Sequence, residues 1–547
     1  MTERQRLGVI TEGSLVEGLK AKLDPAASVE EMRAGQFVII QGQRHEFFSL
    51  ITDVQLGATN PRVLQDPPLP GGDDEFVAQV VMGTSTFGRL AIQPMLMLPR
   101  DLSEGNLQPV RTVPSHFSPV HQAQEWDFTR VFGQDTISGQ VRIGKRKFFE
   151  MGKPLDMEVP VCVNLERFVE RSNGIFGKSG TGKSFLARLL LCGVIRADAA
   201  VNLIFDMHSE YGHDAITEAG GFVKGLRQLF PGQVLVYSLD PESSRRRGVP
   251  VDAALTLGLN QIEAEDVALL QDELNLTSTA VESSYLLGGE YKARWLEALL
   301  EMDGEGLRDF AEARGAHTGA LSALQRKLRR VGGLGFTVPS ATESAIGELI
   351  ECLEAGKHVV LEFGRYRDVL SYMLVANVIT RRIHRLWMNK TERYLQTKDP
   401  QDRPRQLVIT IEEAHKFLNP QAARQTIFGT IAREMRKYYA TLLVIDQRPS
   451  GIDNEVLSQI GTRITALLND EKDIDAVFTG VSGASQLRSV LAGLDERQQA
   501  LILGYAVPMP VVIRTRSFDE EFYAAIGLPD AETRRQQVIQ DIDELFG

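Results

Sequence analysis

Residues 177–184 read GKSGTGKS, between the short apolar run GIF at 174–176 and the apolar stretch FLARLLLCGVI at 185–195. The stretch matches the pattern G-x-x-x-x-G-K-[ST] of a phosphate-binding loop, and the flanking runs predict the strand and the helix that border such a loop. Glycines let successive backbone N–H groups point at phosphate oxygens, and the helix N-terminus adds partial positive charge. The residues expected to contact a nucleotide are Gly177, Lys178, Ser179, Gly180, Thr181, Gly182, Lys183, Ser184 and Phe185.

Two residues of this loop carry the expected chemistry. Lys183 is expected to reach the β- and γ-phosphates of ATP, and Ser184 to bind Mg²⁺. The alternative is a glycine-rich turn that arises by chance, and the strand and helix on either side disfavour it. The sequence therefore predicts ATP and Mg²⁺ as cofactors and ATP hydrolysis as the reaction.

Short apolar segments of strand length alternate with helical stretches after about residue 160. The candidate strands are residues 172–176, 201–206, 234–238, 358–362, 406–411, 441–446 and 463–467. Such alternation predicts a parallel sheet with helices on both faces, so the expected fold class is α/β.

One of these segments, QLVITIEE at 406–413, ends in two acidic residues, Glu412 and Glu413. A buried strand that ends in carboxylates places them at the carboxyl edge of a parallel sheet, where such sheets bind ligands. We expect Glu412 to hold Mg²⁺ and Glu413 to polarise the attacking water. The alternative is an ordinary acidic pair at the start of the next helix.

Two further strand ends carry polar residues. Asp206 ends the run VNLIFD and is expected to help orient water or the metal shell. Gln447 follows the run TLLVID, and its amide is expected to hold the γ-phosphate or the attacking water. The alternative for Gln447 is a turn residue ahead of a proline.

The chain divides into five expected regions. They are a small N-terminal β-barrel at 1–104, the first part of the core with the phosphate loop at 105–259, a helical insertion at 260–335, the second part of the core at 336–517, and a helical C-terminal tail at 518–547. The prediction of a β-barrel is based on short apolar or alternating runs at 36–41, 47–54, 75–82 and 89–98, which turn-rich segments separate. A β-sandwich is the alternative for this region. The proline-rich residues 109–119 are expected to form a linker.

Composition narrows the class of protein. Sixty Lys and Arg residues against 72 Asp and Glu residues give the 547-residue chain a formal net charge of −12. This acidic balance argues against a protein that coats nucleic acid with its whole surface, but it leaves room for a local basic strip. Two candidate strips are RRR at 245–247 and RKLRR at 326–330, each either a DNA-phosphate contact or an ordinary solvated face.

No apolar run reaches the length needed to span a bilayer, and the N-terminus lacks the apolar core of a signal peptide. Three cysteines lie far apart without a C-x-x-C pair, which is typical of a reducing compartment. We therefore expect a cytoplasmic protein without membrane contact.

Five motifs occur in the order found in the HerA family, a branch of the HerA–FtsK superfamily of RecA-like translocation motors. They are SNGIFGKSGTGKS at 172–184, DMHSEY at 206–211, IEEAHKFL at 411–418, AREMRKY at 432–438 and DQRPS at 446–450. The resemblance covers about residues 105–520, and the N-terminal region is similar to the small barrel that these proteins carry. It implies a RecA-like P-loop NTPase core and a homo-oligomer, a hexameric ring that threads duplex DNA and acts with a separate nuclease or antiphage defence effector.

The resemblance also implies roles for individual residues. Lys183, Asp206, Glu413 and Gln447 are implied to work on the nucleotide. Arginines of a neighbouring subunit are implied as well, and these match Arg436 and Arg171, with Arg433, Arg448 and Lys437 as rivals. The alternative for Arg436 is a solvated helix residue paired with Glu434 or Glu413.

A second function stays open beside the DNA motor. The chain would then be a regulatory ATPase ring that scaffolds and activates an effector protein without productive DNA translocation. The acidic balance and the lack of an obvious DNA-binding domain favour this alternative. Stimulation of ATP hydrolysis by duplex DNA discriminates between the two.

Overall fold

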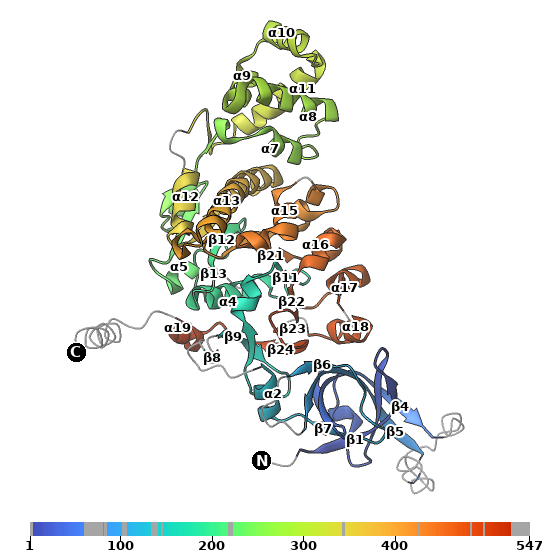
Figure 1. Ribbon diagram of the computed structural model, residues 1–547. Helices are drawn as coiled ribbons and strands as arrows, with labels where there is room; N and C mark the ends of the chain where they lie inside the picture. The colour runs from blue at the N-terminus through green and yellow to red at the C-terminus, as the bar shows by residue number, and fades with distance from the viewer. Residues whose placement is uncertain are drawn as a thin grey trace, which may run out of the picture.

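The computed structural model describes residues 4–59, 80, 85–100, 107–132, 141–143, 146–216, 222–341, 345–424, 426–481, 484–495 and 498–526. Three parts lie in a row in Figure 1: a β-barrel, an α/β body and a bundle of helices that projects from the body. In the part of the chain that is described, no helix combines the length and apolar character needed to cross a bilayer.

The N-terminal part is a closed barrel, as predicted. Its strands are β1 (Arg6–Ser14), β2 (Gly18–Leu23), β3 (Phe37–Gln41), β4 (His45–Ala58), β5 (Thr86–Pro99) and β7 (Pro119–Gln122). The sheet closes because β2 pairs with β1 on one side and with β5 on the other. Inward-facing apolar side chains, among them Leu7, Val38 and Leu90, fill the interior.

Strand β7 corrects two expectations. It pairs with β1 and β3, so the barrel takes its returning strand from beyond residue 104. The proline-rich stretch at 109–119 therefore leads back into the barrel rather than away from it. The run at 75–82, apart from Val80, lies outside the described residues.

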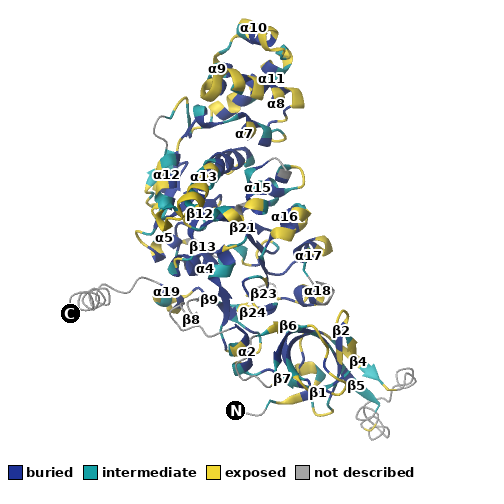
Figure 2. Cartoon of the chain, in the orientation of Figure 1, coloured by how far each residue is buried: buried dark blue, intermediate teal, exposed yellow. Residues whose placement is uncertain are grey.

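The α/β body is built on one large sheet. The seven predicted strands all form, as β11 (Asn173–Phe176), β12 (Val201–Asp206), β15 (Val234–Ser238), β19 (His358–Glu362), β20 (Leu407–Glu412), β21 (Ala440–Asp446) and β22 (Thr462–Thr465). They run parallel in the order β22-β11-β21-β20-β12-β19-β15, and β16 (Ala253–Ala254) extends the far edge. Figure 2 shows these strands buried and the exposed residues concentrated on the outer helices.

The sheet is mixed rather than purely parallel. Beyond β22 it continues through β23 (Gln499–Gly504), β24 (Val511–Thr515), β9 (Arg146–Lys153) and β10 (Val161–Asn164), all antiparallel to their neighbours. Helices α4 (Lys183–Arg196), α12 (Ala345–Glu354) and α15 (Ile427–Glu434) pack against the parallel strands. The long helix α13 (Val369–Thr397) contacts α15 and the insertion.

The predicted helical insertion projects from the body at the top of Figure 1. It contains α7 (Ala264–Leu269), α8 (Ser278–Tyr291), α9 (Trp295–Glu301), α10 (Gly304–Arg314) and α11 (Thr318–Gly332). Its own core includes Leu287, Trp295 and Leu321, and the Trp295 indole N–H donates to the Ile262 carbonyl at 2.8 Å. Of the expected C-terminal tail, α19 (Glu520–Ile526) is described, and residues 527–547 lie outside the described residues.

Candidate nucleotide-binding site

The phosphate-binding loop lies between the end of β11 and the start of α4, as the motif requires. Gly180 and Gly182 have φ angles of 82° and 88°, in the left-handed region where side chains cause strain. At Gly177, a Cβ atom would lie 2.6 Å from Thr181 Oγ1. These positions need glycine because a side chain would be strained at the left-handed φ of Gly180 and Gly182 and would lie too close to Thr181 at Gly177.

Lys183 is the first residue of α4 and lies in the loop. Its Nζ donates to the Lys178 carbonyl oxygen at 2.9 Å. Burial lowers the pKa of Lys183, and the nearby carboxylates of Glu413, Asp446, Glu412 and Glu210 oppose that effect. The ammonium group is therefore held among acidic side chains at the mouth of the loop.

The loop forms one wall of a cavity of about 810 Å³, a size within the range of small-molecule and cofactor sites. The lining comes from segments that are distant in the sequence. It includes Ser179, Lys183, Ser184, Phe185, Arg188, His208, Glu210, Glu412, Glu413, Gln447, Gln498, Arg516 and Phe518. The predicted residues Lys183, Ser184, Glu412, Glu413 and Gln447 thus line one cavity, together with the predicted loop residues Ser179, Thr181 and Phe185.

Glu412 ends β20 and is buried. Its Oε1 accepts a hydrogen bond from the Tyr211 hydroxyl at 3.0 Å, while Oε2 has no hydrogen-bond partner among the described residues. Burial raises the pKa of Glu412 well above its ordinary value, and the charges of Asp206 and Glu210 add to this shift. An unpaired buried carboxylate oxygen in a residue that lines the same cavity as Ser184 fits a hard cation such as Mg²⁺, which prefers oxygen ligands.

Glu413 follows directly, with a backbone φ of 48° that is unusual for a residue with a side chain. This bend turns the chain out of β20, and the side chain is about one-third exposed. The Gln447 amide Nε2 lies 3.4 and 3.5 Å from the two carboxylate oxygens of Glu413. The predicted pair therefore meets at the carboxyl edge, because β20 and β21 are adjacent parallel strands.

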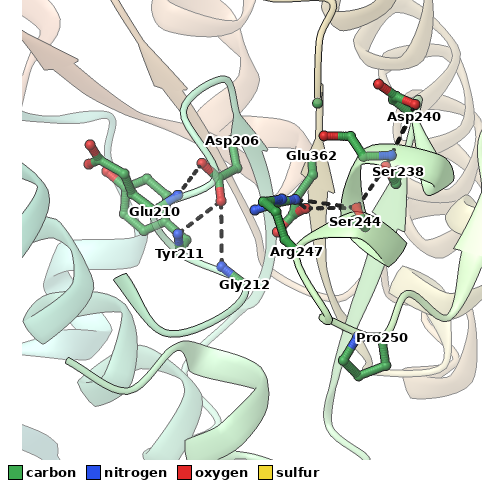
Figure 3. A network of polar contacts seen from close by, with 12 residues as sticks. Asp206, Glu210, Tyr211, Gly212, Ser238, Asp240, Ser244, Arg247, Pro250 and Glu362 are labelled. Atoms are coloured by element: carbon green, nitrogen blue, oxygen red, sulfur yellow. Dashed lines mark hydrogen bonds and ion pairs between the residues drawn. The ribbon is translucent and has the colours of Figure 1, made fainter. Parts of the chain in front are cut away.

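Asp206, at the end of β12, is not among the residues that line the cavity. Its carboxylate accepts from the backbone N–H groups of Glu210 at 2.8 Å, Tyr211 at 2.9 Å and Gly212 at 3.4 Å (Figure 3). Burial raises the pKa of Asp206 to about 6, the Glu362 charge adds to this shift, and the backbone hydrogen bonds oppose it. Its direct role on nucleotide stays a prediction, and the contacts favour a role in positioning the turn.

The two predicted arginines lie at the other edge of the sheet. Arg171 precedes β11 and Arg436 precedes β21, so both are at the amino ends of strands whose carboxyl ends carry the site. The Arg171 guanidinium lies over the Tyr505 ring at 4.1 Å. Neither arginine lines the cavity. Their action on a neighbouring subunit stays a prediction.

The alternative for Arg436 was a solvated helix residue paired with Glu434 or Glu413; the exposed side chain agrees with the solvated part, and no ion pair with either acid is found among the described residues. Lys437, not Arg436, lies 3.7 Å from Glu434, and Glu413 faces Gln447 instead. Arg436 is exposed. Of the rivals, Arg433 is engaged with the Ala423 carbonyl at 3.0 Å.

Sequence reasoning missed the pair formed by Asp446 and His415. Asp446 Oδ2 accepts from the backbone N–H of His415 at 2.6 Å and lies 2.9 Å from its Nδ1. The hydrogen bond to Asp446 raises the pKa of His415, and burial opposes the shift. The sequence feature that could have predicted this pair is Asp446 itself, an acidic residue at the end of the apolar run 441–446, directly before the predicted Gln447.

The far wall of the cavity was also missed. Phe518 meets Phe185 edge to face with ring centroids 5.6 Å apart, and the Arg188 guanidinium lies 5.8 Å from the Phe518 ring centroid. Arg188 also donates to the Glu210 carbonyl. Phe185 was predicted from the loop, but Phe518 and Arg188 belong to no local motif, because Phe518 meets α4 only when the antiparallel strands bring the C-terminal segment beside it.

The family model for the central domain of helicase HerA matches residues 149–383. The DNA double-strand break repair helicase HerA of Sulfolobus acidocaldarius is 24% identical over 500 residues, covering 90% of each chain. The relative of the same name from Pyrococcus furiosus is 24% identical over 439 residues, covering 76% of each chain. Among solved structures, the bacterial conjugative coupling protein TrwB matches with 13% identity and a TM-score of 0.45, over 69% of this chain and 96% of that one.

Proposed function

This chain belongs to the HerA helicase family, and from that premise we propose that it is an ATP-driven ring motor that translocates along or unwinds duplex DNA. The observation that carries the proposal is the joint position of Lys183, Glu412, Glu413 and Gln447 around one cavity. A phosphate-binding loop, a buried acid and a second acid with an amide beside it are the parts that nucleoside triphosphate hydrolysis needs.

The residues divide the work of hydrolysis. The loop amides and Lys183 bind and neutralise the phosphates, while Ser184 and Glu412 hold Mg²⁺. Bound Mg²⁺ supplies positive charge against the phosphate oxygens. Glu413 accepts a proton from the attacking water, and Gln447, within 3.5 Å of that carboxylate, orients the water.

The motor acts as a homo-oligomer, for which a hexameric ring is the expected form. Arg436 or Arg171, placed at the amino edge of the sheet, contacts the ATP of the adjacent subunit in this arrangement. A cation supplied from a neighbour neutralises charge that develops on the transferred phosphoryl group and ties hydrolysis to subunit motion. The chain works with a separate nuclease or antiphage effector.

ATP turnover measured with and without duplex DNA tests this function. We expect DNA to raise turnover several-fold, and the effect to fall as salt is increased, because the contacts are to phosphates. Unchanged turnover with DNA, together with a rise on addition of a partner protein, would instead support a regulatory ring. The net charge of −12 favours that second function.

A further inference from the structure

Two fully buried carboxylates lie side by side at the carboxyl ends of neighbouring strands in the sheet. Asp206 ends β12, Glu362 ends β19, and the two residues are paired in register across these parallel strands. Both have no exposed surface. Two negative charges on adjacent strands in a dry environment destabilise each other, so each carboxylate needs its own hydrogen-bond donors or a positive charge nearby.

The compensation comes from two different segments (Figure 3). Asp206 is held by the backbone N–H groups of the turn at 210–212. Glu362 Oε2 accepts from Arg247 Nη2 at 2.5 Å and from the Ser244 hydroxyl at 3.4 Å. Its Oε1 has no hydrogen-bond partner among the described residues. Arg247 is thus the cation that neutralises the buried acid next to Asp206.

The two segments face different surroundings. The turn held by Asp206 presents His208 and Glu210 to the nucleotide cavity. Arg247 follows α6 (Pro241–Arg246), and its side chain is 34% exposed although it reaches a fully buried carboxylate. The Arg247 side chain therefore reaches from the protein surface to the buried carboxylates next to the turn that lines the cavity.

Arg247 belongs to a basic surface, which we call the α6 patch. The patch consists of Arg245, Arg246 and Arg247 at the end of α6, with Arg365 and Arg367 from the loop after β19. The two segments touch, because Arg365 Nε lies 3.5 Å from Asp240. Four acidic residues share these segments: Asp240 and Glu362 are buried, Asp368 caps α13, and Glu242 is exposed.

We propose that the α6 patch binds the phosphate backbone of duplex DNA, and that Arg247 transmits this contact to the ATP site by sharing its guanidinium between a DNA phosphate and Glu362. The proposal rests on the proposed function and names the surface and the positioning residue through which DNA acts. Arg247 touches neither ATP nor the reacting atoms.

The chemistry of the guanidinium allows such sharing. Arginine carries five N–H donors in a planar fork. In the part of the chain that is described, Nη2 is the one guanidinium nitrogen of Arg247 that donates a hydrogen bond, to Glu362 and Ser244. A phosphate that engages the exposed donors reduces the positive charge that Arg247 presents to Glu362. The electrostatic repulsion between Glu362 and Asp206 then changes, and Asp206 holds the turn that carries Glu210.

The first experiment tests the patch. Duplex DNA binding is measured by fluorescence anisotropy at several salt concentrations for the wild type and Arg245→Gln/Arg246→Gln. Lys292→Gln/Arg308→Gln, in the exposed part of the insertion, removes the same charge as a matched control. We expect about tenfold weaker binding and a shallower salt dependence for the patch variant. Equal affinities of the patch and control variants would overturn the proposal.

The second experiment tests the transmission. Arg247→Gln leaves Glu362 uncompensated beside Asp206, and we expect its turnover without DNA to fall about tenfold. In Arg247→Gln/Glu362→Gln the uncompensated charge is gone, so turnover rises again relative to the single variant while stimulation by DNA stays lost. Arg247→Lys keeps a charge and is expected to retain part of the stimulation. If Arg247→Gln does not fold, the double variant, which buries no unpaired charge, carries the test.

The outcomes separate this proposal from the function on which it rests. DNA stimulation of the double variant that equals the wild type overturns the role of Arg247 and leaves the motor function standing. Wild-type protein that hydrolyses ATP with no response to duplex DNA overturns both.

Discussion

Gln447 Nε2 lies 3.4 and 3.5 Å from the two carboxylate oxygens of Glu413, although 34 residues separate them in the sequence. The pair forms because β20 and β21 are neighbouring parallel strands and each residue follows the end of its strand. An acid that accepts a proton and an amide that orients water are thus placed together at the mouth of the phosphate loop.

Replacing Lys183 with alanine removes the main positive charge at the loop. We expect ATP turnover to fall at least about 100-fold, because one preorganised charge-stabilising contact is commonly worth that much. The measurement is phosphate release at saturating ATP, with circular dichroism to show that the fold is kept. Lys472→Ala, an exposed lysine outside the cavity, is the control. Near-normal turnover of Lys183→Ala would contradict the assignment of the loop.

Glu413→Gln tests the proton acceptor. The amide has nearly the same shape but does not accept a proton from water, so we expect hydrolysis to fall about 100-fold to 10,000-fold while ATP binding stays close to that of the wild type. Calorimetry with ATP and single-turnover kinetics measure the two steps separately. A loss of binding equal to the loss of turnover would point to a structural role.

Glu412→Gln tests the metal ligand. Glu412 Oε2 is buried without a hydrogen-bond partner among the described residues, and a bound cation would compensate it. We expect the Mg²⁺ concentration for half-maximal turnover to rise about tenfold or more, since even outer-shell partners change metal affinity by 10-fold to 100-fold. A Mg²⁺ titration at fixed ATP gives this value. Unchanged Mg²⁺ dependence would show that Glu412 is not a ligand.

His415→Asn tests the contact with Asp446 through its pH dependence. The hydrogen bond to Asp446 raises the pKa of His415 above its ordinary value near 6.5, so this contact contributes stability that is complete below pH 6.5 and is lost as the pH rises through the raised pKa. The substitution is expected to cost about 1.5–3 kcal/mol at low pH, as for hydrogen bonds to charged groups. Thermal unfolding at pH 5.5, 7 and 9 compares the two proteins. A difference that grows with pH would contradict this sign.

Mixed rings test whether Arg436 acts on a neighbour. Arg436→Ala and Glu413→Gln subunits are each expected to be inactive alone. Mixing them creates some interfaces with an intact Glu413 on one side and an intact Arg436 on the other, so part of the activity returns. ATP turnover is measured across mixing ratios, and the same series with Arg171→Ala compares the two arginines. No recovery at any ratio would exclude action across the interface.

Local sequence determined the core strands, the phosphate loop and the strand ends that carry the site residues. The seven core strands were predictable because buried parallel strands are short apolar runs, and the loop because GKSGTGKS has a backbone requirement that glycine satisfies at Gly180 and Gly182. The positions of Glu412, Glu413 and Gln447 at strand ends followed from the same runs.

The antiparallel strands β9, β10, β23 and β24 were not predicted, nor was the return of the chain through β7 into the barrel. The sequences of these strands have no periodicity that would show which strand, or which sheet, each of them pairs with. Register across strands far apart in the chain decides such pairings, and no local pattern records it.

The sequence by itself determined that a phosphate loop and several acidic strand ends exist, because these depend on the conformation and burial of neighbouring residues. Only the tertiary structure decided which of them share a space. The sequence indicated that Asp206 orients water or the metal shell, and this role stays a prediction; strand order places the residue beside Glu362, with its oxygens engaged by the following turn. The sequence left Arg247 as either a DNA-phosphate contact or a solvated charge, and it did not indicate that this side chain also reaches the same buried acid. The physical reason is that the free energy of a charged side chain depends on the groups that packing brings within a few ångströms of it.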